Sequence, residues 1–286
     1  MKCKKEWMRL YAVTDRAWAV RQESEETDDE IFGQKMSGEE TDDRSSVQRM
    51  SGKVVGDKST EQKISEEEDN DRSSEQRISE KQVDDLIPGE KTLKKQVEAA
   101  IRGGVTCVQL REKNLPREKF LAEAIRMAKL CRSHQVPFVV NDDPEIALLS
   151  GADGVHIGQD DMKIADVRRL LGADKLIGVS AHTVEEAVAA EKSGADYLGV
   201  GAVFTTSTKS NVRALSMETL RDICRAVAIP VVAIGGITKD NAMQLAGSGV
   251  DGIAVVSAIF AEKDCRKAAA DLRGMVDSMI DLVPDF

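Results

Sequence analysis

Two pairs of neighbouring aspartates stand at the ends of short apolar runs in residues 138–161, FVVNDDPEIALLSGADGVHIGQDD. Asp142 and Asp143 close the first run, and Asp160 and Asp161 close the second. Carboxylates held close together repel each other unless a cation or a shared proton lies between them. A hard divalent cation suits oxygen ligands, and Mg²⁺ usually keeps several waters and bridges to substrate phosphates. The sequence therefore predicts a Mg²⁺ site wherever the fold brings these two ends together.

The two members of each pair differ in their surroundings. Asp143 precedes Pro144, which is typical of a residue that caps the next helix. Asp160 can simply face solvent. We therefore expect one metal ligand from each pair, Asp142 and Asp161, with Asp143 and Asp160 in supporting roles.

Cationic and amide side chains follow another apolar run, in QLREK. Gln109, Arg111 and Lys113 occupy alternate positions there, and would lie on one side of an extended chain. Arginine offers a bidentate fork and lysine a point charge, so this set suits a phosphate or a pyrophosphate. The alternative is a solvated strand end that carries these residues by chance.

Hydroxyl groups and a further cation follow two later runs. In GVSAHT, Ser180 can donate to a phosphate oxygen or a polar ring, and His182 could shuttle a proton or serve a structural role. TTSTKS supplies Thr206, Thr208 and Lys209. These three predict an anion-binding set rather than a nucleophile, because no base adjoins them.

Backbone amides are the expected contribution of the last two runs. AIGGIT leaves the N–H groups of Gly235 and Gly236 bare, and in VVSAI Ser257 precedes a helix. Such loops cradle phosphate groups, although glycines can also serve close packing. The sequence thus predicts two anion sites, one around Arg111 and Lys113 beside the metal and one around the later segments. Two phosphorylated substrates could then face each other.

Alternating strands and helices must hold these groups in place. The predicted strands are residues 9–15, 105–113, 136–143, 154–161, 175–182, 197–204, 229–236 and 252–260. The predicted helices are residues 92–104, 117–135, 144–151, 163–172, 183–194, 217–227, 239–249 and a terminal one from about Asp264.

Eight short apolar strands, each followed by a helix, predict an α/β fold of the (β/α)8 TIM-barrel class. Chemistry in such barrels takes place at the C-terminal ends of the strands, where the residues above stand. Neighbouring strands lie about 4.8 Å apart, so the ends at Asp142 and Asp161 become neighbours. An open doubly wound sheet is the alternative, but the loop after the first strand lacks a GxGxxG fingerprint.

Residues 22–90 form an acidic segment unlike the rest of the chain. They hold 22 acidic and 9 basic residues while the whole chain carries −10, so the remainder carries +3 and could suit an anionic ligand. QKMSG, QRMSG, QKISE and QRISE recur there every 14 residues. Each repeat has too few apolar residues for a coiled coil, which favours disorder. We predict one TIM-barrel catalytic domain, residues 1–21 and 91–286, with this low-complexity insert in its first βα loop, on the active-site face.

The spacing of the cysteines and the lack of long apolar runs indicate the cellular compartment of the protein. The five cysteines include no CxxC pair, which favours reduced thiols over disulfides or zinc. The first residues lack the apolar region of a signal peptide, and no run of 18 apolar residues occurs. We expect a cytoplasmic protein with neither a membrane nor nucleic acid as a partner, and a homo-oligomer stays open.

The strand ends also resemble one enzyme family. YAVTD, QLREK, VNDD, GVHIGQDD, GVSAHT, TSTK, AIGGI and VVSAI, in this order and spacing, resemble thiamine phosphate synthase, also called thiamine-phosphate pyrophosphorylase. The resemblance covers residues 8–21 and 91 to about 275. It implies a Mg²⁺-dependent transferase that joins hydroxymethylpyrimidine diphosphate to thiazole phosphate and gives thiamine phosphate and pyrophosphate. In that family the diphosphate leaves first and the thiazole nitrogen captures a pyrimidine-methyl cation, which requires leaving-group stabilisation more than a general base.

By position, the resemblance also implies a role for each residue. The metal ligands would be Asp142 and Asp161, and the catalytic residues would be Arg111, Lys113, Ser180 and Lys209. The pyrimidine diphosphate would be held by Gln109, Arg111, Lys113, Asn141, Ser180 and Lys209. Thiazole phosphate would be held by Thr206, Thr208, Gly236, Val256 and Ser257.

Two features depart from the family pattern. After TSTK the family continues to a Pro-containing, Gly-ending turn, whereas this chain reads SNVRALS, and the acidic repeats have no counterpart. A thiazole tautomerase-like barrel is one alternative function, but its proton transfer would not need the carboxylate pair. A non-catalytic regulatory barrel with an acidic recruitment segment is another, and the intact QLREK, NDD and GQDD argue against it.

Overall fold

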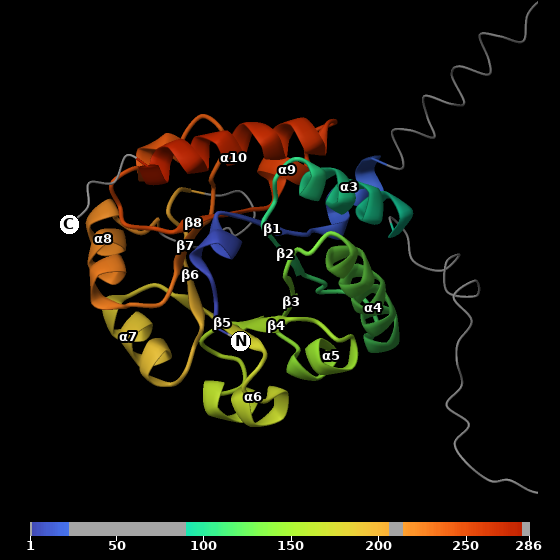
Figure 1. Cartoon of the computed structure of the whole chain (residues 1–286), viewed down its shortest axis with the longest axis horizontal. Coiled ribbons are helices and arrows are strands. Elements are labelled where there is room, and N and C mark those ends of the chain that lie inside the picture. Colours follow the sequence, from blue (N-terminus) through green and yellow to red (C-terminus); the bar gives the residue numbers. More distant parts are fainter. Residues whose placement is uncertain (1, 23–89, 206–213, 282–286) are drawn as a thin grey trace, which may run out of the picture.

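Eight parallel strands close into a barrel in the computed structural model, which describes residues 2–22, 90–205 and 214–281 (Figure 1). Each strand pairs with the next one along the chain, and β8 pairs with β1. The strands are β1 Leu10–Val13, β2 Cys107–Leu110, β3 Phe138–Asn141, β4 Gly154–Ile157, β5 Leu176–Ala181, β6 Tyr197–Gly201, β7 Val231–Ile234 and β8 Gly252–Val255. The predicted (β/α)8 class is confirmed. Every strand is shorter than predicted, mainly because the polar residues at the C-terminal ends lie in loops. The predicted end of the last strand, residues 257–260, is a short helix instead.

Helices surround the barrel, and the last of them, α10, packs against α3 (Figure 1). The α-helices are α3 Glu90–Arg102, α4 Arg117–Ser133, α5 Pro144–Leu149, α6 Ile164–Leu171, α7 Val184–Lys192, α8 Met217–Ala226, α9 Ser257–Phe260 and α10 Cys265–Asp281. In α3, Leu93, Val97 and Ala100 recur at helical spacing and are fully buried, whereas Lys94 and Lys95 are exposed. The apolar face of this helix is therefore the one that covers the barrel.

The helix predicted over 239–249 is wrong. Only a four-residue 3-10 helix, η2 Ala242–Leu245, forms there. Asn241 explains the difference, since its side-chain oxygen accepts a hydrogen bond from the backbone N–H of Thr238 at 2.8 Å. Its side-chain amide donates to the carbonyl oxygen of Gly236 at 2.9 Å. These local side-chain bonds compete with the helical backbone pattern and hold the segment in a turn.

The strands are buried on both sides, which is why each one reads as a continuous apolar run. One apolar cluster lies between the strands and the helices. A second cluster fills the inside of the barrel and consists of Met8, Tyr11, Val13, Cys107, Val139, Tyr197, Val232 and Ala254. A short 3-10 helix, η1 Lys5–Met8, contacts β1 and β8 and buries Met8 in this cluster. The barrel is thus a packed core, and its functional groups must stand at the C-terminal ends of the strands.

The two flanks of the predicted insert lie side by side (Figure 1). Residues 16–22 are helical, and Gln96 of α3 donates a hydrogen bond from Nε2 to Oε1 of Gln22 at 2.5 Å. Apart from its two end residues, the predicted insert of residues 22–90 lies outside the described residues. The segment that leaves β1 and the helix that follows the insert are therefore joined directly.

All five cysteines are free thiols, as predicted. Among the helices of the described ranges, none is long and apolar enough to cross a membrane.

Candidate active site

A cavity of about 380 Å³ opens at the C-terminal ends of the strands, and every strand contributes to its wall. The predicted site residues that line it are Gln109, Arg111, Asn141, Ser180, His182, Gly236, Val256 and Ser257. Gly235 and Asp15 also line it. Residues that are far apart in the sequence thus converge on one pocket, as the barrel class requires.

The two predicted metal ligands lie together beside this cavity. The carboxyl groups of Asp142 and Asp161 are within hydrogen-bonding range of each other. Partial burial raises the pKa of Asp142, and the charge and hydrogen bond of Asp161 raise it further. The positive charges of Lys113 and Arg111 act on the same carboxyl group in the opposite direction. The four groups therefore form one cluster of two carboxylates and two cations.

Local backbone geometry places each carboxylate. Asp142 has a φ of 65°, a left-handed conformation that aspartate and asparagine tolerate better than most residues. Its backbone N–H donates to the carbonyl oxygen of His156 at 2.8 Å, which ties the end of β3 to β4. Asp161 accepts a hydrogen bond at Oδ2 from the backbone N–H of Gly158 at 2.6 Å, which folds the loop after β4 back toward the strand end.

The other member of each aspartate pair has a different environment. Asp143 caps α5, as predicted, because its Oδ1 accepts from the backbone N–H of Ile146 at 2.8 Å. Its Oδ2 pairs with Arg117 at 2.5 Å. Asp160 is exposed, again as predicted. Only one carboxylate of each pair therefore belongs to the cluster beside the cavity.

A hydrogen-bonded chain inside the barrel was not predicted. The hydroxyl of Tyr11 lies 2.8 Å from that of Tyr197 and accepts from Nε2 of Gln109 at 2.9 Å. His156 continues the chain, with Nδ1 at 3.2 Å from the Tyr197 hydroxyl and Nε2 at 3.1 Å from Oγ of Ser180. Burial lowers the pKa of His156 to about 4, so the imidazole is neutral near pH 7. Two predicted substrate-binding residues, Gln109 and Ser180, are thus held by one interior network.

Two glycines make room for this network. Strand register places Gly178 opposite both His156 and Tyr197. A Cβ atom on Gly178 would lie 2.1 Å from Cζ of Tyr197 and 2.5 Å from Nδ1 of His156. On Gly199 it would lie 3.0 Å from Cε1 of His156. The sequence carries one signal for this network, the polar His156 within an apolar strand and the glycines Gly178 and Gly199 in the next two strands. These residues can be matched only once the strand register is known.

The glycine pair after β7 brings two loops into close contact. Gly235 and Gly236 have positive φ values of 103° and 65°, which favour glycine. A Cβ atom on Gly236 would lie 2.5 Å from the carbonyl oxygen of Thr205. These glycines therefore serve close packing, the alternative considered above, and they also line the cavity. Thr206, Thr208 and Lys209 lie outside the described residues.

His182 lies at the open side of the cavity. Its side chain is half exposed, and Nδ1 lies 3.1 Å from Oε2 of Glu186, which also accepts from the backbone N–H of His182. The carboxylate orients the imidazole ring. The role of His182 stays a prediction.

Comparison with known proteins identifies the family to which the chain belongs. The model of the family described as "Thiamine monophosphate synthase" matches residues 78–259, more than half of the chain. The chain belongs to this family. The resemblance seen at the strand ends is thereby confirmed.

Individual members of the thiamine monophosphate synthase family are similar over most of their length. The thiamine-phosphate synthase of Ruminiclostridium cellulolyticum is 52% identical over 170 residues, which are 59% of this chain and 81% of that protein. The thiamine-phosphate synthase of Clostridium acetobutylicum is 49% identical over 168 residues, 59% of this chain and 80% of that protein. The structure of thiamine phosphate pyrophosphorylase from Pyrococcus furiosus is 30% identical with a TM-score of 0.65, and covers 96% of this chain and 98% of that one.

Proposed function

We propose that this protein condenses hydroxymethylpyrimidine diphosphate with thiazole phosphate and releases thiamine phosphate and pyrophosphate. Family membership supports the reaction. The observation that carries the proposal is the cluster beside the cavity, in which Asp142 and Asp161 lie in contact and Arg111 and Lys113 act on the same carboxyl group. Such a cluster suits a polyanionic substrate that brings a divalent cation with it.

The carboxylate pair fits Mg²⁺. Within residues 2–22, 90–205 and 214–281 no three His, Cys, Asp or Glu side chains gather into a metal site. Mg²⁺ does not need such a cage, because it typically binds through one or two carboxylates and completes its shell with water and substrate phosphates. Asp142 and Asp161 would hold the ion, which would neutralise charge on the departing pyrophosphate. The raised pKa of Asp142 supports this assignment, because partial burial and the charge of Asp161 disfavour its ionised form, and a divalent cation would offset both.

The residues around the cavity would divide between the two substrates. Those for the pyrimidine diphosphate are Gln109, Arg111, Lys113, Asn141, Ser180 and Lys209, and those for thiazole phosphate are Thr206, Thr208, Gly236, Val256 and Ser257. Arg111 and Lys113 would stabilise the leaving diphosphate as charge develops on it. Gln109 and Ser180, fixed by the interior network, would orient the pyrimidine ring so that its methylene carbon faces the thiazole nitrogen.

We further propose that residues 1–21 and 91–286 form one catalytic domain and that residues 22–90 are an insert in its first βα loop. The direct contact between Gln22 and Gln96 supports this division. The protein would act in the cytoplasm, where its five free thiols stay reduced.

The test uses the purified full chain with both substrates and Mg²⁺ and measures thiamine phosphate formation. We expect product from the wild type and loss of at least 100-fold in activity in Asp142→Ala and Asp161→Ala, an order of magnitude typical of removed charge stabilisation. Asp160→Ala is the matched control and should keep full activity, because Asp161 and not Asp160 is among the groups that act on the carboxyl group of Asp142. No product from the wild type, or full activity in both Asp142→Ala and Asp161→Ala, would exclude the proposal. A tautomerase-like activity would appear instead as proton exchange without pyrophosphate release.

A further inference from the structure

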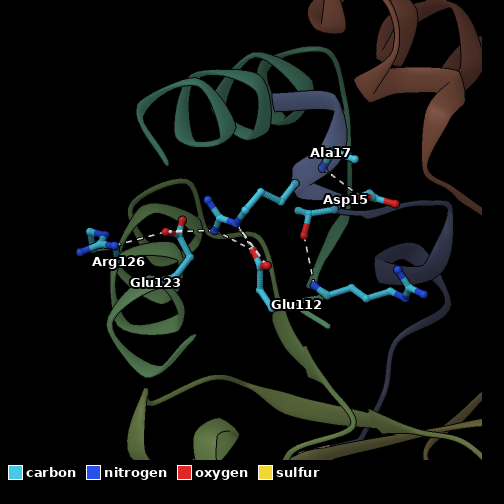
Figure 2. Close-up of polar contacts among 8 residues, drawn as sticks. Asp15, Ala17, Glu112, Glu123 and Arg126 are labelled. Atoms are coloured by element: carbon cyan, nitrogen blue, oxygen red, sulfur yellow. Dashed lines mark hydrogen bonds and ion pairs between the residues drawn. The ribbon is translucent and has the colours of Figure 1, made fainter. Parts of the chain in front are cut away.

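A buried network of charges lies behind the loop that carries Arg111 and Lys113 (Figure 2). Glu112, between these two cations, turns the other way and binds the guanidinium of Arg16. Nε of Arg16 donates to Oε1 and Oε2 of Glu112 at 3.0 and 3.2 Å, and Nη2 donates to Oε1 at 2.7 Å. The side chains are 14% and 4% exposed, respectively. A forked pair of this kind fixes geometry as well as contributing energy.

A second carboxylate shares the same guanidinium. Nη2 of Arg16 lies 3.4 Å from Oε2 of Glu123 in α4, and Arg126 donates to that oxygen at 3.2 Å. Figure 2 shows Glu112 and Glu123 facing each other across this network, with Arg126 on the far side of Glu123. Glu123 is only 1% exposed and would be costly to bury without these cations. Burial alone would lower the pKa of Arg16, but the hydrogen bond and charge of Glu112 hold it above its ordinary value.

The end of β1 fixes the same loop from a second side. Thr14 is fully buried, and its backbone N–H donates to the carbonyl oxygen of Gln109 at 2.9 Å. Its Oγ1 accepts from the backbone N–H of Arg111 at 3.1 Å. Asp15, which lines the cavity, accepts at Oδ1 from the N–H of Ala17 at 3.0 Å and starts the helical segment that carries the guanidinium (Figure 2). Backbone and side-chain contacts therefore hold Gln109 in β2 and both Arg111 and Glu112 in the loop.

The direction of the three side chains follows from this anchoring. Glu112 is held in the network, whereas its two neighbours act at the cavity. Arg111 lines the cavity and Lys113 acts on the carboxyl group of Asp142. Arg16 is not among the residues that line the cavity. Its link to the loop of Arg111 and Lys113 is the forked pair with Glu112.

We propose that Arg16 is a positioning residue for the reaction, because its buried pairing with Glu112 holds the loop after β2 so that Arg111 and Lys113 face the substrate diphosphate together. The inference rests on the proposed function for the nature of that diphosphate. A displacement of a binding group by about 1 Å can cost on the order of 100-fold in rate. Lysine at position 16 would keep the charge but replace the fork by a single contact. The loop would then lose its fixed orientation without leaving Glu112 and Glu123 unpaired.

The test compares Arg16→Lys and Glu112→Gln with a matched control, Arg168→Lys. Arg168 pairs with Asp196 at 2.5 Å with side chains 27% and 20% exposed, at the opposite end of the barrel where Asp196 precedes β6. Each variant is assayed for the KM of both substrates, for its melting temperature, and for binding of inorganic pyrophosphate with Mg²⁺ by calorimetry. We expect Arg16→Lys to raise the KM of the pyrimidine diphosphate and the Kd of Mg²⁺-pyrophosphate about tenfold, with the KM of thiazole phosphate unchanged. Arg168→Lys should lower only the melting temperature.

Two results would overturn the inference. One is wild-type pyrophosphate affinity in a folded Arg16→Lys, and the other is an equal rise in the KM of both substrates, which a general loss of structure would produce. If Arg16→Lys does not fold, Glu112→Gln is judged by the same criteria, because it keeps the shape of the side chain and removes only its charge. A wild type that binds Mg²⁺-pyrophosphate but forms no thiamine phosphate would refute the proposed function alone, since the pyrophosphate titration still judges the role of Arg16.

Discussion

Replacing Asp142 by asparagine separates two effects of the carboxylate pair, its repulsion and its affinity for a metal. Asparagine suits the perturbation because it tolerates the left-handed φ of 65° at this position, whereas alanine would add backbone strain. It is also nearly the same size as aspartate. Only the charge next to Asp161 is removed.

The magnitude follows from the charges of the pair. Two unit charges about 4 Å apart in a water-like environment repel by about 1 kcal/mol. Without metal, Asp142→Asn should therefore be more stable than the wild type by up to about 1 kcal/mol, or about 2–4 °C in melting temperature for a chain of this size. With Mg²⁺ and pyrophosphate at about 100 times their Kd, the wild type should gain about 2.7 kcal/mol. The variant should lose most of that gain.

Thermal unfolding with a chelator, and again with Mg²⁺ and pyrophosphate, measures both effects on the same samples. The order of stability should invert between the two conditions, with Asp142→Asn higher in chelator and the wild type higher with ligand. Asp160→Asn is the control and should follow the wild type in both, because Asp160 is not among the groups that act on the carboxyl group of Asp142. A variant that is less stable than the wild type in chelator, or that gains as much from the ligand, would refute the reasoning.

Three other predictions concern the interior network and the insert. Burial lowers the pKa of His156 to about 4, so between about pH 6.5 and 4 the unfolded chain binds a proton there that the folded chain does not. The free energy of unfolding should therefore be highest above pH 6.5 and decrease by up to about 3 kcal/mol as the pH falls to 4. Urea unfolding of His156→Asn should lack this pH dependence. Gly178→Ala should destabilise the protein by about 1–3 kcal/mol in urea unfolding, because its Cβ would lie 2.1 Å from the Tyr197 ring; an unchanged midpoint would contradict the strand register. Deleting residues 24–88 removes most of an acidic segment and should lower the KM of the diphosphate substrate at low salt but not at high salt, where charges are screened; equal KM values at every ionic strength would exclude the electrostatic effect.

Features that depend on local pattern were predictable from the sequence. Strand ends such as Asn141 and Ser180 were placed correctly because short apolar runs mark buried parallel strands and the barrel brings their C-terminal ends together. The cap at Asp143 followed from its position before proline. The helix predicted over 239–249 was wrong because the side-chain hydrogen bonds of Asn241 favour a turn, which the sequence pattern does not reveal.

Features that depend on three-dimensional register were not predictable. His156 is a polar residue within an apolar strand, and only the pairing of β4, β5 and β6 shows that it faces Gly178 and contacts Tyr197. Arg16 and Glu112 lie 96 residues apart, and neither carries a local signal of its partner. In both the interior network and the Arg16–Glu112 pair, the partners are distant in sequence and become neighbours only in the folded barrel.

The contact between Gln22 and Gln96 bears on how this barrel can change over evolution or by engineering. Closing a flexible connection costs only about 0.6 kcal/mol for each doubling of its length, and here the two ends are already held together by the folded domain. The position after β1 is therefore an attachment point where sequence can be gained or exchanged at little cost to the barrel. Anything carried there would be tethered beside the mouth of the cavity, at a high effective concentration relative to entering substrates.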